Sequence, residues 1–162
     1  MRTGNGGRWV WCPVGLVLLV ALGGCGSSTQ PSGPTNGSLT AKIDGSSWTA
    51  SNIVATYPSG ILAVAGTDTQ GRTIGFAVGP TTATGTFPVA ITSGVNASLT
   101  IASGSSAQSW NAVQTSGSGS VTLTTITATH AVGTFQFTVV PVPGTGATGS
   151  RSITQGSFDV NY

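Results

Sequence analysis

The chain has 162 residues, of which only 5% are charged, and its formal net charge is +2. An average globular domain carries roughly 25% charged residues. Apolar residues make up 38% of the chain, which is enough to form a core, so the composition argues against a disordered chain. The polarity comes from serine and threonine, accompanied by 25 glycines. Threonine favours strands, whereas glycine and serine favour turns, so the composition indicates an all-β, extracytoplasmic protein.

Residues 1–24 have the layout of a secretory signal peptide. Two arginines form a short basic region, an apolar stretch centred on "VGLVLLVAL" follows, and two glycines precede Cys25. The alternative is a transmembrane helix. The apolar stretch 9–24 contains Pro13, however, and is shorter than the about 20 residues that a span requires. We therefore expect residues 1–24 to be cleaved.

The sequence "LGGC" that ends at Cys25 resembles the lipobox of bacterial lipoproteins. The resemblance implies that the Cys25 thiol receives a diacylglycerol, that the signal peptide is cleaved just before it, and that the new amino terminus is acylated. Cysteine suits this role because its sulfur is the strongest side-chain nucleophile. Several acyl chains also give stable membrane anchoring. The next residue is Gly26 rather than the aspartate that usually marks inner-membrane retention, so the resemblance points to the outer membrane of a bacterial cell envelope.

Residues 25–38 are predicted to be the lipidated cysteine and a flexible tether, because "GSSTQPSGPTNGS" has no aliphatic or aromatic residue. Thirteen such residues have an r.m.s. reach of about 20 Å. After cleavage the acidic and basic side chains balance, and they are Lys42, Arg72, Arg151, Asp44, Asp68 and Asp159. A neutral chain has no basic surface for nucleic acid, so no nucleic-acid partner is expected.

Residues 39–162 are predicted to form one β domain. Apolar residues alternate with a period of two in "SLTAKID", "ILAVAG", "TIGFAV", "ASLTIA", "GTFQFTVV" and "SFDVNY", and turn signals such as Asp44-Gly45 separate them. In "GSVTLTTIT" the alternation shifts by one, which predicts a bulge near Thr124-Thr125. The fold class is therefore an antiparallel β-sandwich of about eight to ten strands, with a partly closed β-barrel as the alternative.

A short pattern occurs three times: "GTFPV" at 85–89, "GTFQF" at 133–137 and "GSFDV" at 156–160. The spacing is unequal, so the pattern does not mark a repeat protein. We expect glycine to permit a tight turn or bulge, with the phenylalanine and the residue two positions later in the core. A binding role for this pattern is the weaker alternative.

The stretches "LTAKIDGSSWTA", "GTDTQGR", "GSGSVTLTTIT" with "GTFQF", and "ITQGSFDVNY" resemble a family of small bacterial lipoproteins of uncharacterised function. The resemblance covers nearly all of the chain beyond the signal peptide and implies a single β-rich domain. It implies no catalytic residues, since the shared motifs are those of strands and turns.

The sequence offers few groups for catalysis or for holding a metal. The three aspartates are expected at structural positions, with Asp68 capping its turn and pairing with Arg72. His130 is the only histidine, no G-x-S-x-G elbow occurs, and too few ligands remain for a metal site. The "GTGATG" stretch at 144–149 lacks the following helix that a dinucleotide site needs. We therefore predict a protein that is not an enzyme and has no cofactor; a hydrolase using His130 with an aspartate is the least favoured alternative.

Trp110, flanked by Gln108 and Asn111 in "AQSWNAV", is the best binding candidate, because aromatic stacking beside amide groups suits a sugar ligand. Core packing is the competing interpretation for this tryptophan, as it is for Trp48. We therefore predict a lipid-anchored, non-catalytic envelope protein that binds a glycan or an envelope protein. The alternative is a structural or assembly role through exposed strand edges, since the expected chain has a single lysine to protect them.

Overall fold

The computed structural model describes residues 37–162 apart from residue 105, and these residues belong to one unit of the chain, Pro31–Tyr162. The predicted signal peptide, Cys25 and almost all of the predicted tether lie outside the described residues. The first strand begins at Gly37, two residues before the predicted start of the β domain. Among the residues that are described, no helix has the length and hydropathy needed to cross a membrane.

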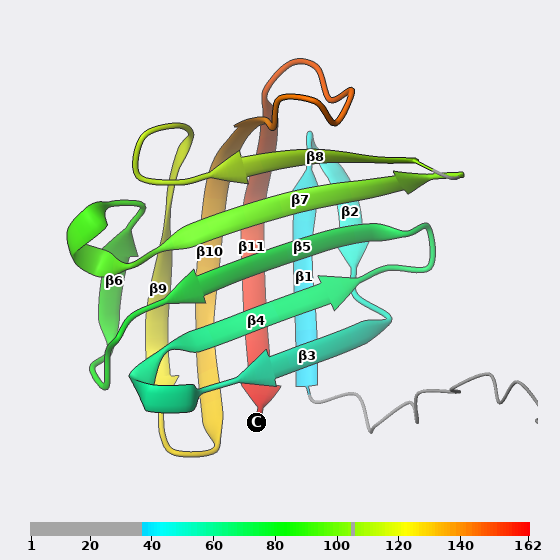
Figure 1. The fold of residues 1–162 in the computed structure, drawn as a ribbon. Coiled ribbons are helices and arrows are strands. Elements are labelled where there is room, and N and C mark those ends of the chain that lie inside the picture. The colour runs from blue at the N-terminus through cyan, green and yellow to red at the C-terminus, as the bar shows by residue number, and fades with distance from the viewer. Residues whose placement is uncertain (1–36, 105) are drawn as a thin grey trace, which may run out of the picture. The chain divides into compact units, whose positions relative to one another are not determined.

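Eleven strands and two short 3₁₀ segments make up the described part, and all strand pairs are antiparallel (Figure 1). The strands are β1 Gly37–Ile43, β2 Ser46–Thr49, β3 Asn52–Thr56, β4 Leu62–Thr67, β5 Arg72–Val78, β6 Gly85–Pro88, β7 Asn96–Ser103, β8 Ser106–Ala112, β9 Ser118–Ile126, β10 His130–Pro141 and β11 Arg151–Asn161. The 3₁₀ segments are η1 Pro58–Gly60 and η2 Ile91–Ser93.

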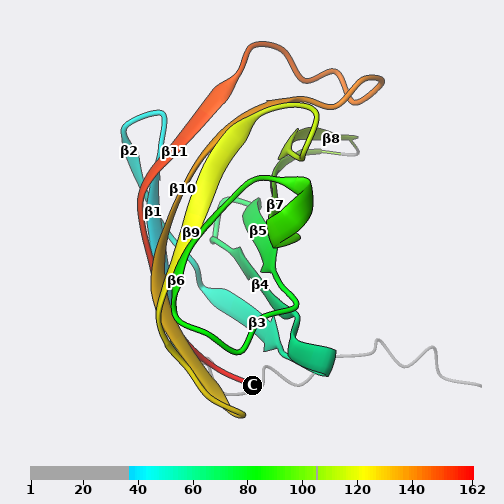
Figure 2. The same cartoon turned by 90° about the vertical axis from the view of Figure 1, so that its left-hand side faces the viewer.

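The strands form one sheet that folds over into two layers (Figure 2). The first layer has the order β2-β1-β11-β10-β9-β6, and the second has the order β8-β7-β5-β4-β3. The far end of β10 also pairs with β8, which joins the two layers. The sheet is not closed, so the all-β class and the sandwich are confirmed. The strand number exceeds the predicted eight to ten because β2 and β6, of four residues each, are too short to show an alternation.

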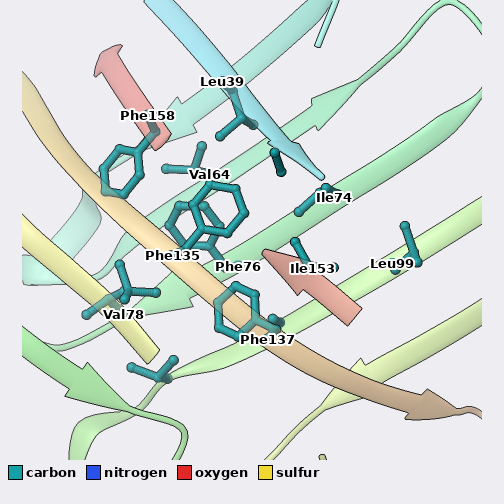
Figure 3. Packing of buried hydrophobic residues seen from close by; sticks show 14 of the residues in the cluster. Leu39, Val64, Ile74, Phe76, Val78, Leu99, Phe135, Phe137, Ile153 and Phe158 are labelled. Carbon is teal, nitrogen blue, oxygen red and sulfur yellow. The ribbon is translucent and has the colours of Figure 1, made fainter. Parts of the chain in front are cut away.

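The core lies between the two layers and follows the predicted period of two. Four phenylalanines form its centre, with the Phe76 ring 5.0 Å from Phe135 and 5.2 Å from Phe158 between centroids (Figure 3). Trp48 is 1% exposed, as its core interpretation predicted, and donates from Nε1 to the Arg72 carbonyl at 3.1 Å. Aromatic rings packed at these distances stabilise the fold by about 0.5–1.5 kcal/mol per pair beyond the effect of burying their surface.

The predicted bulge is present in β9. Val132 lies opposite Thr125 and Gly133 lies opposite Leu123, so Thr124 has no partner position on β10. A second bulge, which was not predicted, interrupts β11 between its pairs with Phe135 and Phe137. At this bulge Gln155 has a positive φ of 52°, a conformation that costs energy for a residue with a side chain.

Candidate functional site

The second and third recurrences of the G-[ST]-F pattern lie on the neighbouring strands β10 and β11, and the first lies on β6, which β9 separates from β10. Gly133 of β10 lies opposite Phe158 of β11, and Phe135 lies opposite Gly156, so the second and third copies run antiparallel with their glycines and phenylalanines exchanged. The Phe158 ring packs on Gly133 and the Phe135 ring packs on Gly156. This close packing is possible because glycine has no Cβ that would clash with the ring. The expectation that these phenylalanines enter the core is confirmed. The two glycines fit the expected bulges, since the β9 bulge lies opposite the Val132–Gly133 step and the β11 bulge lies next to Gly156. They also allow a close approach inside the sheet, which was not expected.

The middle residue of each pattern points away from the core. Thr86 pairs with Thr122, Thr122 with Thr134, Thr134 with Ser157, Ser157 with Thr40, and Thr40 with Thr49. Six hydroxyl side chains therefore form one line across β6, β9, β10, β11, β1 and β2, which we call the hydroxyl row. Five are exposed and Thr122 is half-buried. Adjacent strands lie about 4.8 Å apart, so the row extends for about 24 Å.

A depression of about 490 Å³ lies across the middle of the hydroxyl row. Its rim carries hydroxyl and amide groups, and its lining residues are Ser120, Thr122, Thr134, Phe135, Gln136, Gln155, Gly156 and Ser157. A second depression, of about 270 Å³, shares Gln136 and continues along the same strands toward Thr138 and Thr154. The β11 bulge places Gln155 beside the row, and bulges are frequent next to binding sites because they re-aim a side chain.

The hydroxyl row is neutral and offers both donors and acceptors. Thr86 and Thr122 share a hydrogen bond of 2.9 Å between their Oγ1 atoms. The lining of both depressions contains no charged side chain. Each hydroxyl provides one donor and two acceptor positions, and each glutamine amide provides both kinds of group. The surface can therefore form many weak hydrogen bonds to a neutral, hydroxyl-rich ligand, without attraction for ions.

The structure contradicts the prediction that Trp110 contacts a ligand. The side chain is 0% exposed, and its Nε1 donates to the Gly149 carbonyl at 2.8 Å. The Arg151 guanidinium covers the ring, with Cζ 5.0 Å from the centroid. In β8 the side chains alternate between the faces, so Trp110 enters the core and no ring surface is left for stacking.

Gln108 and Asn111 are also not brought together into one site. They are three residues apart on a strand, so they point to opposite faces. Gln108 donates from Nε2 to the Gly146 carbonyl at 3.4 Å, within the loop of residues 142–150, whereas Asn111 lies opposite Ser98 and Val140. The "GTGATG" stretch belongs to this loop, which covers Trp110 and satisfies its indole. No helix follows the stretch, since β11 begins at Arg151.

The aspartates occupy structural positions in the described chain. The predicted Asp68–Arg72 pair is confirmed, with Oδ2 2.7 Å from Nε, while Oδ1 accepts from the Gln70 and Arg72 backbone N–H groups. Burial opposes the charged form of Asp68, but these donors outweigh it and lower the pKa of the carboxyl. Burial likewise opposes the charge of Asp44, and the Ser152 N–H and Arg151 outweigh it, so its pKa is also lowered.

His130 and Asp159 form the pair that the hydrolase alternative requires, with Nε2 2.8 Å from Oδ1. Both side chains are open to solvent, at 34% and 57% exposure, and neither lines the depressions on the hydroxyl row. A histidine–carboxylate pair that activates a nucleophilic side chain needs a hydroxyl or thiol held against the histidine. His130 also accepts a hydrogen bond at its backbone carbonyl, where β10 begins, from the Tyr162 hydroxyl at 3.2 Å. This contact holds the ends of the strands together.

Metal ligands are equally sparse. Within residues 37–162, residue 105 aside, no three His, Cys, Asp or Glu side chains gather closely enough to hold an ion. The predicted lack of a metal site rests on the same shortage of ligands in the sequence.

Tyr162 gives a testable effect of alkaline pH. Burial raises the pKa of its phenol, and the neighbouring Tyr57 adds to the shift. The stabilisation that the neutral phenol provides is complete below its unfolded pKa, about 10, and is lost as the pH rises through the folded pKa. We expect the free energy of unfolding to fall more between about pH 9 and about pH 11 in the unaltered chain than in Tyr162→Phe. Denaturant titrations at each pH measure this; equal slopes for both chains would contradict it.

The fold and the hydroxyl row define a class of protein: an open β-sandwich that presents a row of six hydroxyl side chains on one outer face and, among its described residues, has no cluster of metal ligands. The chain belongs to the DUF6252 family, a domain of unknown function, which matches residues 35–160. This confirms the predicted membership in an uncharacterised family. No curated protein and no solved structure matches the chain.

The hydroxyl row was not predicted from the sequence, although the sequence carries one signal for it. The recurring G-[ST]-F pattern places a hydroxyl between two inward positions in each copy. Only the strand register shows that the three copies, with Thr122, Thr40 and Thr49, lie in one line.

Proposed function

We propose that this protein is a lipid-anchored, non-catalytic binding module of the bacterial cell envelope, and that its ligand is a neutral glycan bound on the hydroxyl row. The observation that carries the proposal is the line of six outward hydroxyl side chains, with a depression of about 490 Å³ across its middle and a second, of about 270 Å³, beside it on the same strands. The spacing of about 4.8 Å between adjacent hydroxyls is close to the repeat of one sugar residue in an extended glycan.

Glycan binding on the hydroxyl row would not use the aromatic stacking that the sequence predicted. Trp48 and Trp110 are buried, and Tyr57 and Tyr162 pack against each other away from the depressions. Recognition would therefore depend on hydrogen bonds to Thr, Ser and Gln side chains rather than on stacking. Each such bond contributes about 0.5–1.5 kcal/mol net, so useful affinity requires an extended ligand that meets several positions of the row.

The anchoring half of the proposal is supported by "LGGC" at Cys25 and by the uncharged tether that follows. Growth with labelled palmitate tests it: the purified chain should carry the label, and Cys25→Ser should not. An unlabelled chain that retains residues 1–24 would overturn it.

The glycan half is tested by a matched pair of double variants of the full chain, purified in detergent and screened on a panel of neutral and charged glycans. Thr134→Val with Ser157→Ala removes two adjacent hydroxyls of the row. Thr100→Val with Ser109→Ala removes an equivalent Thr–Ser pair from the outer face of the second layer, where the two hydroxyls lie 3.4 Å apart. We expect the first double variant to lose about tenfold in affinity for a bound neutral glycan and the second to lose none.

Two outcomes of this screen would contradict the proposal. One is binding of charged glycans only, because the row has no ionic partner for them. The other is an equal loss in both double variants, which would mean that the lost affinity is unrelated to the row.

A second candidate function, assembly through strand edges, is favoured by β3. This strand ends the order of its layer and pairs with β4 on one side. Its sequence, "NIVAT", has no charge or proline, and Val54 is 55% exposed. Edges without such protection tend to pair with another strand. Sedimentation of the full chain at rising concentration separates the candidates, since a strict monomer would exclude self-assembly through β3.

A further inference from the structure

One end of the sandwich gathers the first described residue of the chain, its last residue and the described tyrosines. Gly37 begins β1 opposite Val160, and the Tyr162 N–H donates to the Thr129 carbonyl at 3.1 Å. Figures 1 and 2 both show η1, the β9–β10 turn and the C-terminus at this end. We call it the tyrosine end and define it as Gly37, residues 57–61, 80–82, 127–130 and 159–162.

The side chains at the tyrosine end are amphipathic. The Tyr57 and Tyr162 rings pack at a centroid distance of 5.3 Å, and their hydroxyls donate to the carbonyls of Thr81 and Thr127. Beside them, Pro58 and Pro80 are exposed, and Ile61 is 40% exposed. Apolar side chains therefore lie next to two phenols. Tyrosine is enriched at membrane interfaces for this combination of an apolar ring and a polar hydroxyl.

Charge is distributed unevenly between the two ends. At the tyrosine end the described chain carries Asp159, which His130 contacts at 2.8 Å. The other charged side chains of the described chain lie away from the tyrosine end. Lys42, Asp44 and Arg151 are near the ends of β1 and β11 that are farther from it. Asp68 and Arg72 are at the β4–β5 turn. The tyrosine end can therefore approach a lipid headgroup region with little cost of removing charges from water.

The position of Gly37 decides which surface this end meets. If Cys25 carries lipid, as proposed above, the chain from the lipid to Gly37 would have an r.m.s. reach of about 20 Å and would join the domain at the tyrosine end. That end is then held near the bilayer at a high effective concentration, which favours even weak contacts. We propose that the tyrosine end rests on the membrane surface, with Ile61 and the two prolines in the headgroup region, and that the loop of residues 142–150 faces away. This inference rests on the proposed lipid anchor.

The test uses the full, lipidated chain in vesicles of phosphatidylethanolamine and phosphatidylglycerol. A single environment-sensitive fluorophore is attached through Ile61→Cys or, as the matched control, through Thr148→Cys, which is exposed on the 142–150 loop at the opposite end. Ile61 has no side-chain group that can form a hydrogen bond, and both positions are exposed. Nitroxide carried by the lipid headgroup should cause a loss of fluorescence at position 61 and none at position 148.

The outcomes separate this inference from the proposed function. Equal quenching at both positions, in a chain that carries palmitate label, would overturn the orientation and leave the anchor intact. A chain without lipid would overturn both. Retained strand content by circular dichroism in both labelled chains confirms that a difference in quenching does not come from unfolding.

Discussion

Replacing Trp110 by alanine is expected to lower the free energy of unfolding by about 4 kcal/mol, since removing a fully buried tryptophan typically costs about 3–5 kcal/mol. The indole is 0% exposed and lies under Arg151 and the loop of residues 142–150. Its removal leaves a cavity and also leaves the Gly149 carbonyl without its donor. Domains of this size are stable by only about 5–15 kcal/mol, so the effect should be large.

Denaturant unfolding of the full chain measures this loss, and two comparisons interpret it. Trp110→Phe keeps most of the volume and should be milder than alanine. Gln108→Ala, on the same strand but half-buried, should change stability by no more than about 0.5 kcal/mol. A Trp110→Ala chain of normal stability that no longer binds glycan would instead restore the binding role that the sequence suggested.

Gly133→Ala is expected to cost about 3 kcal/mol, at the upper end of the range for overpacked cores. An added Cβ would lie 2.2 Å from the Thr122 carbonyl oxygen and 2.7 Å from the Phe158 ring. The ring can rotate only within a crowded core, and the carbonyl belongs to the β9–β10 ladder. Relief therefore requires a shift of a whole strand pair, which would also disturb the neighbouring hydroxyl of Thr134.

Gly75→Ala provides the matched control, since Gly75 is also a mid-strand glycine with an ordinary φ. Its added Cβ would meet the Ser98 Oγ at 3.2 Å, and this small side chain can turn away. We expect a neutral or slightly stabilising effect, because glycine in a strand is unfavourable by about 0.5–1 kcal/mol relative to alanine. Equal destabilisation by both substitutions would refute the proposed close packing at Gly133.

Much of the fold could be predicted from local pattern. The alternation of Leu39, Ala41 and Ile43 identified an inward face, and all three are buried. The Thr124 bulge followed from a change of parity, and the Asp68–Arg72 pair from the spacing of two charges in a turn. Each of these features depends on residues that are close in sequence, where the period of a strand and the geometry of a turn leave few alternatives.

The site could not be predicted in the same way. A tryptophan between two amides looks the same in sequence whether its strand turns the ring inward or outward, and the loop of residues 142–150 that accepts its hydrogen bond lies 39 residues away at Gly149. The bulge at Gln155 has no local signature either, since it is set by the register of β11 against both β1 and β10.

The sequence by itself determined the all-β class, the inward phenylalanines of the G-[ST]-F pattern and the near-neutral charge of the domain, because these depend on composition and on a two-residue period. Tertiary structure decided that Thr86, Thr134 and Ser157 share one line with three hydroxyls from other strands, and that Trp110 lies in the core. The physical reason is that strand register is fixed by long-range pairing: a shift of one residue would turn every one of these side chains to the opposite face.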